Sequence, residues 1–439
     1  MKRKIGYFTA VLLAVMVLFG SCQKKAASTG AAGKADDAAK YAVTEPITIE
    51  WWHALENQYA GTVEKVVKGF NSSQKLVTVQ ARYIGSYAQL NEALVAAHAA
   101  GTGLPAISAA NTPYVAEYGA GGLTEDLKPY IKATNFDIND FGEGLIAATA
   151  YKDKQAALPF LISTQVIFYN ADMAKALGVQ VPTKWNDMEP FLKAASKRSG
   201  GKTDVWALII PGWDQWYFET FYLNNGVKIV NPDGKSTDLD SPKAIEIAQK
   251  FKSWCDAGYM YWAAGTNASN IMRQNFWDGK AFAVSHTSSL YNTYVDNCKF
   301  KVGMVWLPGQ DTNISEIGGS VILIPAKADQ KVKNAGWQFM NYMVSKDVNM
   351  LWAKETGYMP TRKSVLNTQE GQAFVTEKPA FKVIFDNLDQ IKPRIQHGAW
   401  SQLARIWLAY MAETITENKN VPDQMKKMSA EINEVLADS

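Results

Sequence analysis

Aromatic and polar side chains are interleaved most densely in the segment PGWDQWYFETFYLNNG, residues 211–226. Indole and phenol rings present flat apolar faces on which the C–H surfaces of polyhydroxy compounds stack, while amides and ring N–H groups bond hydroxyls. Trp213 and Trp216 are therefore the first candidates for ligand contacts. Further tryptophans at predicted loops or element ends are Trp51, Trp52, Trp254, Trp262, Trp306 and Trp400. Any single one of them is more often a core residue.

The sequence offers few groups suited to catalysis. Hydrolysis of a glycosidic bond needs two carboxylates about 5–9.5 Å apart, and only Glu56, Asp214 and Glu219 lie close in sequence to the candidate aromatic residues. No G-x-x-x-x-G-K-[ST] loop for nucleotide phosphates is present. The four histidines, none paired at i,i+4 or near a cysteine, argue against a zinc site. We therefore expect a protein that is not an enzyme and uses no metal or cofactor, with a surface glycosidase as the alternative.

Residues 47–112 alternate between strand and helix patterns, which predicts a parallel sheet with helices on both faces. The first strand, ITIEWW, places Ile47, Ile49 and Trp51 on one face, and a helix over residues 87–100 follows the second strand. Ligands of such sheets bind beyond the carboxyl ends of the strands. The side chains that fall there, or at the following helix starts, are Trp52, His53, Tyr87, Asn111 and Thr112. We expect them to converge on one edge of the sheet.

A second series of strands and helices begins near residue 165, and the last part of the chain is mostly helical. The predicted strands are QVIFYN, VWALIIPGW, AFAVSHTSSL, VGMVWLP and GGSVILIPA, and the predicted helices span residues 241–257, 271–276, 331–344, 346–355, 381–388 and 400–439. About 390 residues follow the N-terminal segment, too many for one hydrophobic core and natural for two domains. The predicted fold class is therefore α/β with two domains.

The N-terminus has the pattern of an export signal. Three basic residues at positions 2–4 precede an apolar run over residues 5–19, and two small residues then lead to Cys22. The run is shorter than the roughly 20 residues of a membrane-spanning helix. The segment LFGSC resembles a bacterial lipobox, although Phe19 stands where the strict motif has leucine. We expect residues 1–21 to be removed and Cys22 to carry lipid; the alternative is an ordinary signal peptide with a chance cysteine.

Residues 22–46 are small and polar with a single aromatic residue, so they cannot bury enough apolar surface to fold. They predict a flexible tether between the lipid and the folded part. Two or more acyl chains anchor a protein stably without a spanning helix. We therefore expect an exported protein, anchored by lipid at the cell membrane and facing the periplasm or the cell surface.

The net charge and the cysteine content limit the possible partners and covalent links of the protein. The formal net charge is +3, from 45 Lys and Arg against 42 Asp and Glu, and loss of the three basic signal residues would bring it to zero. Without a basic excess we expect no nucleic-acid partner. Beyond Cys22 the chain has only Cys255 and Cys298. The sequence leaves open whether these two form a disulfide or remain thiols.

Seven segments together carry a resemblance that no single one would support. They are TIEWWHALE, FNSSQKLVTVQARYIGSYAQL, PFLISTQVIFYN, VPTKWNDM, FWDGKAFAVSHTSSL, IGGSVILIP and ETGYMPTRKS. In this order they resemble the extracellular solute-binding proteins of ABC importers, within the large carbohydrate-binding family. Among its members, the glycerol-3-phosphate-binding proteins are similar to this chain at several of these segments. The resemblance extends from Ile47 to the C-terminus.

The resemblance implies a type II periplasmic-binding-protein fold. Two α/β lobes, each a mainly parallel sheet flanked by helices, would be joined by hinge strands. The implied crossings lie near residues 163–166, near residues 317–320 and after residues 358–361. The implied N-terminal lobe comprises residues 47–162 and 320–359, and the implied C-terminal lobe comprises residues 163–319 and 360–439.

The resemblance also implies ligand contacts, position by position. Residues matching ligand-contacting positions of the glycerol-3-phosphate binders are Tyr87, Ser163, Gly319 and Tyr358. Hydroxyl groups and a bare backbone amide can bond a polyhydroxy ligand, and the tyrosines also offer a ring face. The other residues assigned to the site are Trp52, His53, Glu56, Trp213, Trp216 and Ser288.

Three departures from those binders bear on the ligand. Their ligand-binding glutamate falls here on Asn111 or Thr112, and a ligand-binding serine becomes His286. Their phosphate-pairing arginine falls on Ala404, with Arg405 one position away. A phosphate buried in a cleft needs charge-assisted donors, preferably a guanidinium. We therefore expect a neutral sugar, unless Arg405 takes over that role.

The expected function is capture of a mono- or oligosaccharide between the lobes and its delivery to the permease subunits of an ABC importer, by a monomer. Which sugar it binds is left open. A binder of glycerol 3-phosphate or a glycerophosphodiester is the main alternative. A surface lipoprotein that binds another protein is a further one.

Overall fold

The computed structural model describes residues 39–439, apart from the side chain of Leu388. The predicted signal peptide, Cys22 and the first part of the predicted tether therefore lie outside the described residues. Within the described part, every helix is too short or too polar to cross a membrane. The two cysteines in this part, Cys255 and Cys298, are free thiols. Burial raises the pKa of each to about 12, so both remain protonated.

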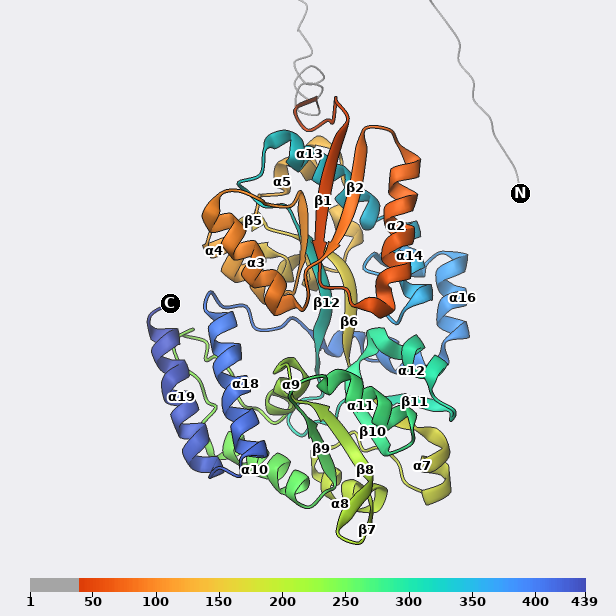
Figure 1. The fold of residues 1–439 in the computed structure, drawn as a ribbon, viewed down its shortest axis with the longest axis vertical. Helices are drawn as coiled ribbons and strands as arrows, with labels where there is room; N and C mark the ends of the chain where they lie inside the picture. The colour runs from red at the N-terminus through yellow and green to blue at the C-terminus, as the bar shows by residue number, and fades with distance from the viewer. Residues whose placement is uncertain (1–38) are drawn as a thin grey trace, which may run out of the picture. The chain divides into compact units, whose positions relative to one another are not determined.

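The folded part has two lobes that share two long strands (Figure 1). In one lobe, β1 (Ile47–His53) lies between β2 (Val77–Tyr83) and β3 (Ile107–Ala110), and all three strands run parallel. Next to β3 comes β12 (Ser315–Leu323), which is antiparallel to β3, and then β6 (Leu158–Asn170). The resulting order is β2-β1-β3-β12-β6.

Strand β6 enters both lobes because it changes partners halfway along. Its residues up to Thr164 pair with β12, whereas residues from Gln165 onward pair with β10 (Ala281–Thr287) and β11 (Val302–Val305). β8 (Lys202–Pro211) runs parallel to β10 and extends the second lobe. The remaining strands are β4 (Ala150–Tyr151), β5 (Lys154–Gln155), β7 (Lys197–Ser199), β9 (Met260–Ala263) and β13 (Ile391–Lys392).

A further segment of the chain lies beside the two shared strands. Met359 forms a bridge to Ile162 in β6, next to the stretch that pairs with β12. The predicted two-lobed α/β class is confirmed. β6 and β12 can run antiparallel because each strand passes directly from one lobe to the other. Parallel neighbours would instead need a helical crossover connection between them.

Helices cover the strands of both lobes (Figure 1). They are α2 (Ala60–Ser73), α3 (Tyr87–Ala100), α4 (Tyr114–Ala120), α5 (Lys128–Ala133), α6 (Glu143–Ala148), α7 (Ala171–Leu177), α8 (Met188–Ala195), α9 (Trp216–Asn224), α10 (Pro242–Asp256), α11 (Ala268–Trp277), α12 (Tyr291–Asn297), α13 (Gln330–Met343), α14 (Lys346–Glu355), α15 (Lys363–Leu366), α16 (Gln369–Glu377), α17 (Lys382–Phe385), α18 (Trp400–Thr416) and α19 (Val421–Ala437). In β1, Trp51 packs into the cluster that contains α2 and α13, while Trp52 packs on the opposite face against α3.

Local sequence explains where two of these helices begin and end. The helix predicted over residues 87–100 is α3, which Ser86 and Gln89 start with reciprocal side-chain-to-backbone hydrogen bonds and Gly101 ends at a φ of 69°. The single helical stretch predicted over residues 400–439 is divided into α18 and α19. Asn418 adopts a φ of 57° and Asn420 caps α19, which stops one helix and starts the next.

Candidate ligand-binding site

A cavity of about 480 Å³ lies where the two lobes face one another beside the shared strands. Residues from the lobe of β1–β3 that line it include Glu56, Tyr59, Tyr87, Asn91, Glu92, Asn111 and Tyr114. Residues from the other lobe include Trp213, Asp214, Gln215, Trp216, Tyr217, Arg273, His286, Arg394, Trp400, Ala404 and Arg405. The shared strands and the segment before Met359 add Ser163, Gly318, Gly319 and Tyr358.

Aromatic rings from both lobes form much of the cavity wall. Trp216 and Tyr217 at the start of α9 have ring centroids 5.0 Å apart, and Trp213 lies 5.7 Å from Tyr217. Tyr59 and Tyr358 form a second pair with centroids 5.5 Å apart. Of the eight tryptophans singled out in the sequence, those on the wall are Trp213, Trp216 and Trp400. The other five, Trp51, Trp52, Trp254, Trp262 and Trp306, belong to the hydrophobic clusters, so they are core residues.

Two residues of the wall have a buried donor atom. The Trp216 ring N–H and the Tyr87 hydroxyl are both buried without a well-formed hydrogen bond, although Ser320 lies close enough to influence the pKa of Tyr87. Burial raises the pKa of Tyr87 far above its usual range, so this hydroxyl keeps its proton. Both atoms are closed off from solvent, so it is the rings of these two residues, and not these donors, that meet the cavity.

Two adjacent glycines in β12 let the Trp216 ring lie against the shared strands. A methyl group at Gly318 would lie 2.4 Å from the Trp216 ring and 2.8 Å from the Ser163 hydroxyl. Gly319 has a φ of 102°, and a methyl group there would lie 2.1 Å from the Leu161 carbonyl oxygen. Gly319 therefore requires glycine, because its conformation is strained for other residues and backbone atoms fill the space, whereas a side chain at Gly318 would displace the Trp216 ring.

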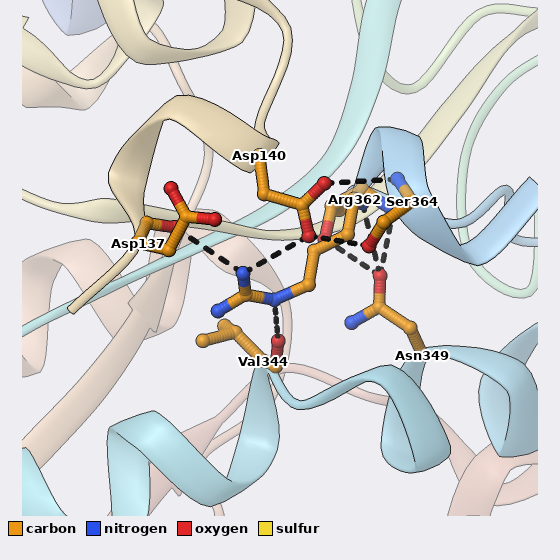
Figure 2. A network of polar contacts seen from close by, with 7 residues as sticks. Asp137, Asp140, Val344, Asn349, Arg362 and Ser364 are labelled. Carbon is orange, nitrogen blue, oxygen red and sulfur yellow. Dashed lines mark hydrogen bonds and ion pairs between the residues drawn. The ribbon is translucent and has the colours of Figure 1, made fainter. Parts of the chain in front are cut away.

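A polar network holds the segment that carries Tyr358 (Figure 2). The Asn349 side-chain oxygen accepts from the Thr361 N–H at 2.7 Å and from the Thr361 hydroxyl at 2.8 Å. The Arg362 guanidinium donates to two backbone carbonyls and pairs with Asp140 Oδ2 at 3.3 Å. Because both side chains of this ion pair are 10% exposed, the network fixes residues 361–364 firmly against Asp140 and Asn349, a few residues after Tyr358.

Two arginines that the sequence analysis did not propose also line the cavity. Arg394 is buried, and its Nε donates to Glu219 Oε1 at 3.1 Å. Arg273 lies 3.9 Å from Glu56 Oε2. Arg394 precedes α18 in the stretch IKPRIQHG, where no periodicity or motif distinguishes it. The sequence marks Arg394 only as a basic residue close to the predicted start of the last helical stretch.

Four residues assigned to the site in the sequence analysis lie away from the cavity wall. The Trp52 ring N–H donates to Glu50 at 2.8 Å, and His53 Nδ1 accepts from the Leu55 N–H at 3.2 Å. The Ser288 hydroxyl accepts from the backbone N–H of Thr164 at 3.1 Å. Thr112 is buried behind Asn111, which does line the cavity. The prediction that these four side chains line the site is therefore not met by the structure.

The remaining assigned residues do line the cavity. These are Glu56, Tyr87, Asn111, Ser163, Trp213, Trp216, His286, Gly319, Tyr358 and Arg405. His286 is buried, and its Nδ1 lies 3.0 Å from the Tyr294 hydroxyl. Burial, and to a lesser degree Arg273, hold the pKa of His286 well below its usual range, so the ring is neutral. Among the described residues, no group of three or more His, Cys, Asp and Glu side chains is placed to hold a metal ion.

Two α/β lobes joined by shared strands, with a cavity between them walled by rings and polar side chains, define a ligand-binding receptor. The model of the bacterial extracellular solute-binding protein family matches residues 65–383, and this chain belongs to that family. The resemblance stated from the sequence is confirmed.

Alignments with named relatives cover most of the chain. The sn-glycerol-3-phosphate-binding periplasmic protein UgpB of Pectobacterium atrosepticum is 24% identical over 359 residues, which are 75% of this chain and 77% of that protein. The GacH receptor of Streptomyces glaucescens, solved unliganded and with acarbose, superposes with a TM-score of 0.78 at 20% identity, covering 90% of this chain and all of that one. UgpB of Mycobacterium tuberculosis in complex with glycerophosphocholine gives a TM-score of 0.78 at 18% identity, covering 90% and 98%. These structures share the two-lobed fold.

Proposed function

We propose that this protein is the substrate-binding lipoprotein of an ABC importer, which captures a mono- or oligosaccharide between its lobes and delivers it to permease subunits in the membrane. The observation that carries the proposal is the cavity of about 480 Å³, with aromatic rings and polar side chains on its walls. Its size is within the range of small-molecule sites. The complex of the similar GacH receptor with acarbose supports a carbohydrate ligand.

In this proposal, residues 47–162 and 320–359 form one lobe, and residues 163–319 and 360–439 form the other. The lobes close around the sugar by bending at the shared strands, which removes water from the site. Trp213 and Trp216 stack on the sugar, while hydroxyl and amide groups bond its hydroxyls. The protein leaves every bond of the ligand intact, acts as a monomer and is held at the membrane, facing the periplasm or the cell surface, by lipid on Cys22.

Native mass spectrometry of gently purified protein, followed by calorimetry with a panel of sugars, tests the ligand class. One sugar should bind saturably, and Trp216→Ala should weaken its binding by about tenfold or more, because a buried aromatic anchor is removed. Tyr83→Ala is the matched control, since this ring is 51% exposed and does not line the cavity. Unchanged affinity in both Trp213→Ala and Trp216→Ala would refute the aromatic-wall argument.

Glycerol 3-phosphate or a glycerophosphodiester is the second candidate ligand. The names of several relatives favour it, and Arg405 is an exposed cation on the cavity wall with no hydrogen bond or ion pair to residues 39–439. The same calorimetry with glycerol 3-phosphate distinguishes the two. If glycerol 3-phosphate binds more tightly than any sugar, and Arg405→Ala abolishes that binding, the ligand of this protein is the phosphorylated compound and not a neutral sugar.

Labelling with radioactive palmitate in the host tests the anchor. The wild type should incorporate label and sediment with membranes. Cys22→Ser should do neither, and label retained in this variant would contradict lipidation at Cys22.

A further inference from the structure

One face of α18 extends the cavity wall away from its aromatic centre. The residues of this helix that line the cavity beyond Trp400 are Ser401, Ala404, Arg405 and Leu408. Because they are spaced at i, i+3, i+4 and i+7, they lie on one face of the helix. At a rise of about 1.5 Å per residue, this stretch is about 10 Å long. The cavity is therefore longer along α18 than a single sugar ring.

Aromatic rings stand on separate parts of the cavity wall. Tyr59 and Tyr358 form one pair, with ring centroids 5.5 Å apart. The Trp216 ring lies against β12, and Trp400 begins α18. The Arg394 guanidinium lies 5.8 Å from each of these two indole rings. Separate ring faces suit successive units of a sugar chain, because each unit offers its own apolar C–H surface.

Contacts between the lobes cross the cavity at one end. Glu56 Oε2 of the lobe of β1–β3 lies 3.9 Å from Arg273 Nη1 of the other lobe. The Tyr59 hydroxyl donates to the Ser289 hydroxyl at 3.1 Å, which also joins the two lobes. All four residues line the cavity. A sugar chain that left the cavity here would have to separate both pairs, so this end is closed to a longer ligand.

The end of the cavity at α18 lacks such contacts. Glu92 in α3 and Arg405 in α18 line the cavity from opposite lobes, and both are exposed. Within residues 39–439, neither side chain takes part in a hydrogen bond or an ion pair. Ala88 and Ser401 are small lining residues on the same two helices. Small side chains and unpaired charges leave this part of the cavity open to solvent.

We propose that the cavity binds a linear oligosaccharide, which ends against Tyr59 and Tyr358, passes Trp216 and continues along α18 toward solvent. Ala88 and Ser401 then determine how long a chain fits, because they leave space between α3 and α18 that larger side chains would fill. This inference rests on the proposed function and deepens it, since it selects a chain over a single sugar.

Calorimetry on the full chain tests the inference with glucose, xylose, mannose and galactose, each beside its linear disaccharide and trisaccharide. In a series that binds, the trisaccharide should bind more tightly than the monosaccharide by about tenfold or more, because further units meet further rings. Equal affinity for the monosaccharide and the trisaccharide would overturn the inference.

Ser401→Trp places a large ring on the α18 side of the open end. It should lower the ratio of trisaccharide affinity to monosaccharide affinity by about tenfold, because only the longer probe reaches this part of the cavity. Ser253→Trp is the matched control, since Ser253 is exposed in α10 and does not line the cavity. If Ser401→Trp does not fold, as judged by thermal unfolding, Ala88→Trp at an exposed position of α3 measures the same ratio. A ratio equal to that of the control contradicts the proposal.

A bulky fluorescent tag on the trisaccharide tests which end is open. A tag at one terminus of the sugar chain should be tolerated. A tag at the other terminus should abolish binding, because contacts between the lobes close that end of the cavity. Tolerance of both tags, or of neither, is incompatible with one open and one closed end.

Failure of the proposed function gives a different result. It would appear as no binding of any of these sugars, whereas failure of this inference alone would appear as sugar binding that does not depend on chain length.

Discussion

Gly318→Ala is the change that should most clearly separate ligand binding from folding. Gly318 pairs with Ser163 where β12 meets β6, at the back of the cavity. The added methyl group would lie 2.4 Å from the Trp216 ring. Carbon atoms pack comfortably at about 3.5 Å, so the ring must retreat by about 1 Å.

The indole can retreat only toward the cavity or into the side chains that surround it. Extra carbon in a packed region costs about 1–3 kcal/mol, and a ring on a cavity wall can transfer much of that cost to the ligand. We therefore expect Gly318→Ala to weaken ligand binding by about tenfold, which corresponds to about 1.4 kcal/mol. The free energy of unfolding should fall by no more than about 2 kcal/mol.

Calorimetry with the bound sugar and urea unfolding measure the two effects separately. Gly144→Ala is the matched control, because a methyl group there meets no atom within 4 Å and the residue lies in α6. It should leave binding unchanged and stability unchanged or higher by up to about 1 kcal/mol. Wild-type affinity and stability in Gly318→Ala would refute the argument that the Trp216 ring rests against the shared strand.

Two further predictions concern stability. Arg362→Met should lower the free energy of unfolding by about 3 kcal/mol, because it removes the only cation paired with the largely buried Asp140 carboxylate, which then keeps only its hydrogen bonds from Ser364. Urea unfolding measures this, with Lys382→Met in an exposed pair as a control that should change by less than about 1 kcal/mol. Burial lowers the pKa of His53 from 6.5 to about 4, so the neutral ring contributes stability that is complete above pH 6.5 and is lost as the pH falls toward 4. The loss should reach about 3 kcal/mol, and His53→Asn should flatten this part of the pH profile; an identical profile in the variant would contradict the assignment.

Much of the fold could be predicted from local patterns. The alternation in ITIEWW correctly placed Ile49 and Trp51 in one hydrophobic cluster. The bounds of α3 followed from Ser86, Gln89 and Gly101, which act within one turn of the helix ends. Such features depend on neighbours in sequence, so one chain suffices to find them.

The same alternation explains why Trp52 was assigned wrongly to the cavity wall. Consecutive residues of a strand point to opposite faces, and both faces of β1 are covered by helices. A position at the carboxyl end of a strand therefore does not decide whether a side chain reaches the cavity. Tyr87 does reach it, because it begins the helix that follows the next strand.

Residues of the site that the sequence analysis missed come from segments far apart in the chain. Tyr59 precedes α2, Tyr114 begins α4 and Arg394 precedes α18, and none of them stands in a distinctive local pattern. Their convergence depends on how the two lobes pack on either side of β6 and β12. Hydrophobic periodicity carries no information about such long-range pairing.

The amino-acid sequence by itself determined the strand and helix order, the two-lobed α/β class and the aromatic segment that contains Trp213 and Trp216. Only the tertiary structure decided which tryptophans face the cavity, and that Arg394 on its wall pairs with the buried Glu219. The physical reason is that secondary structure follows from contacts between near neighbours, whereas the burial and charge of a side chain depend on residues that chain folding brings beside it from hundreds of positions away.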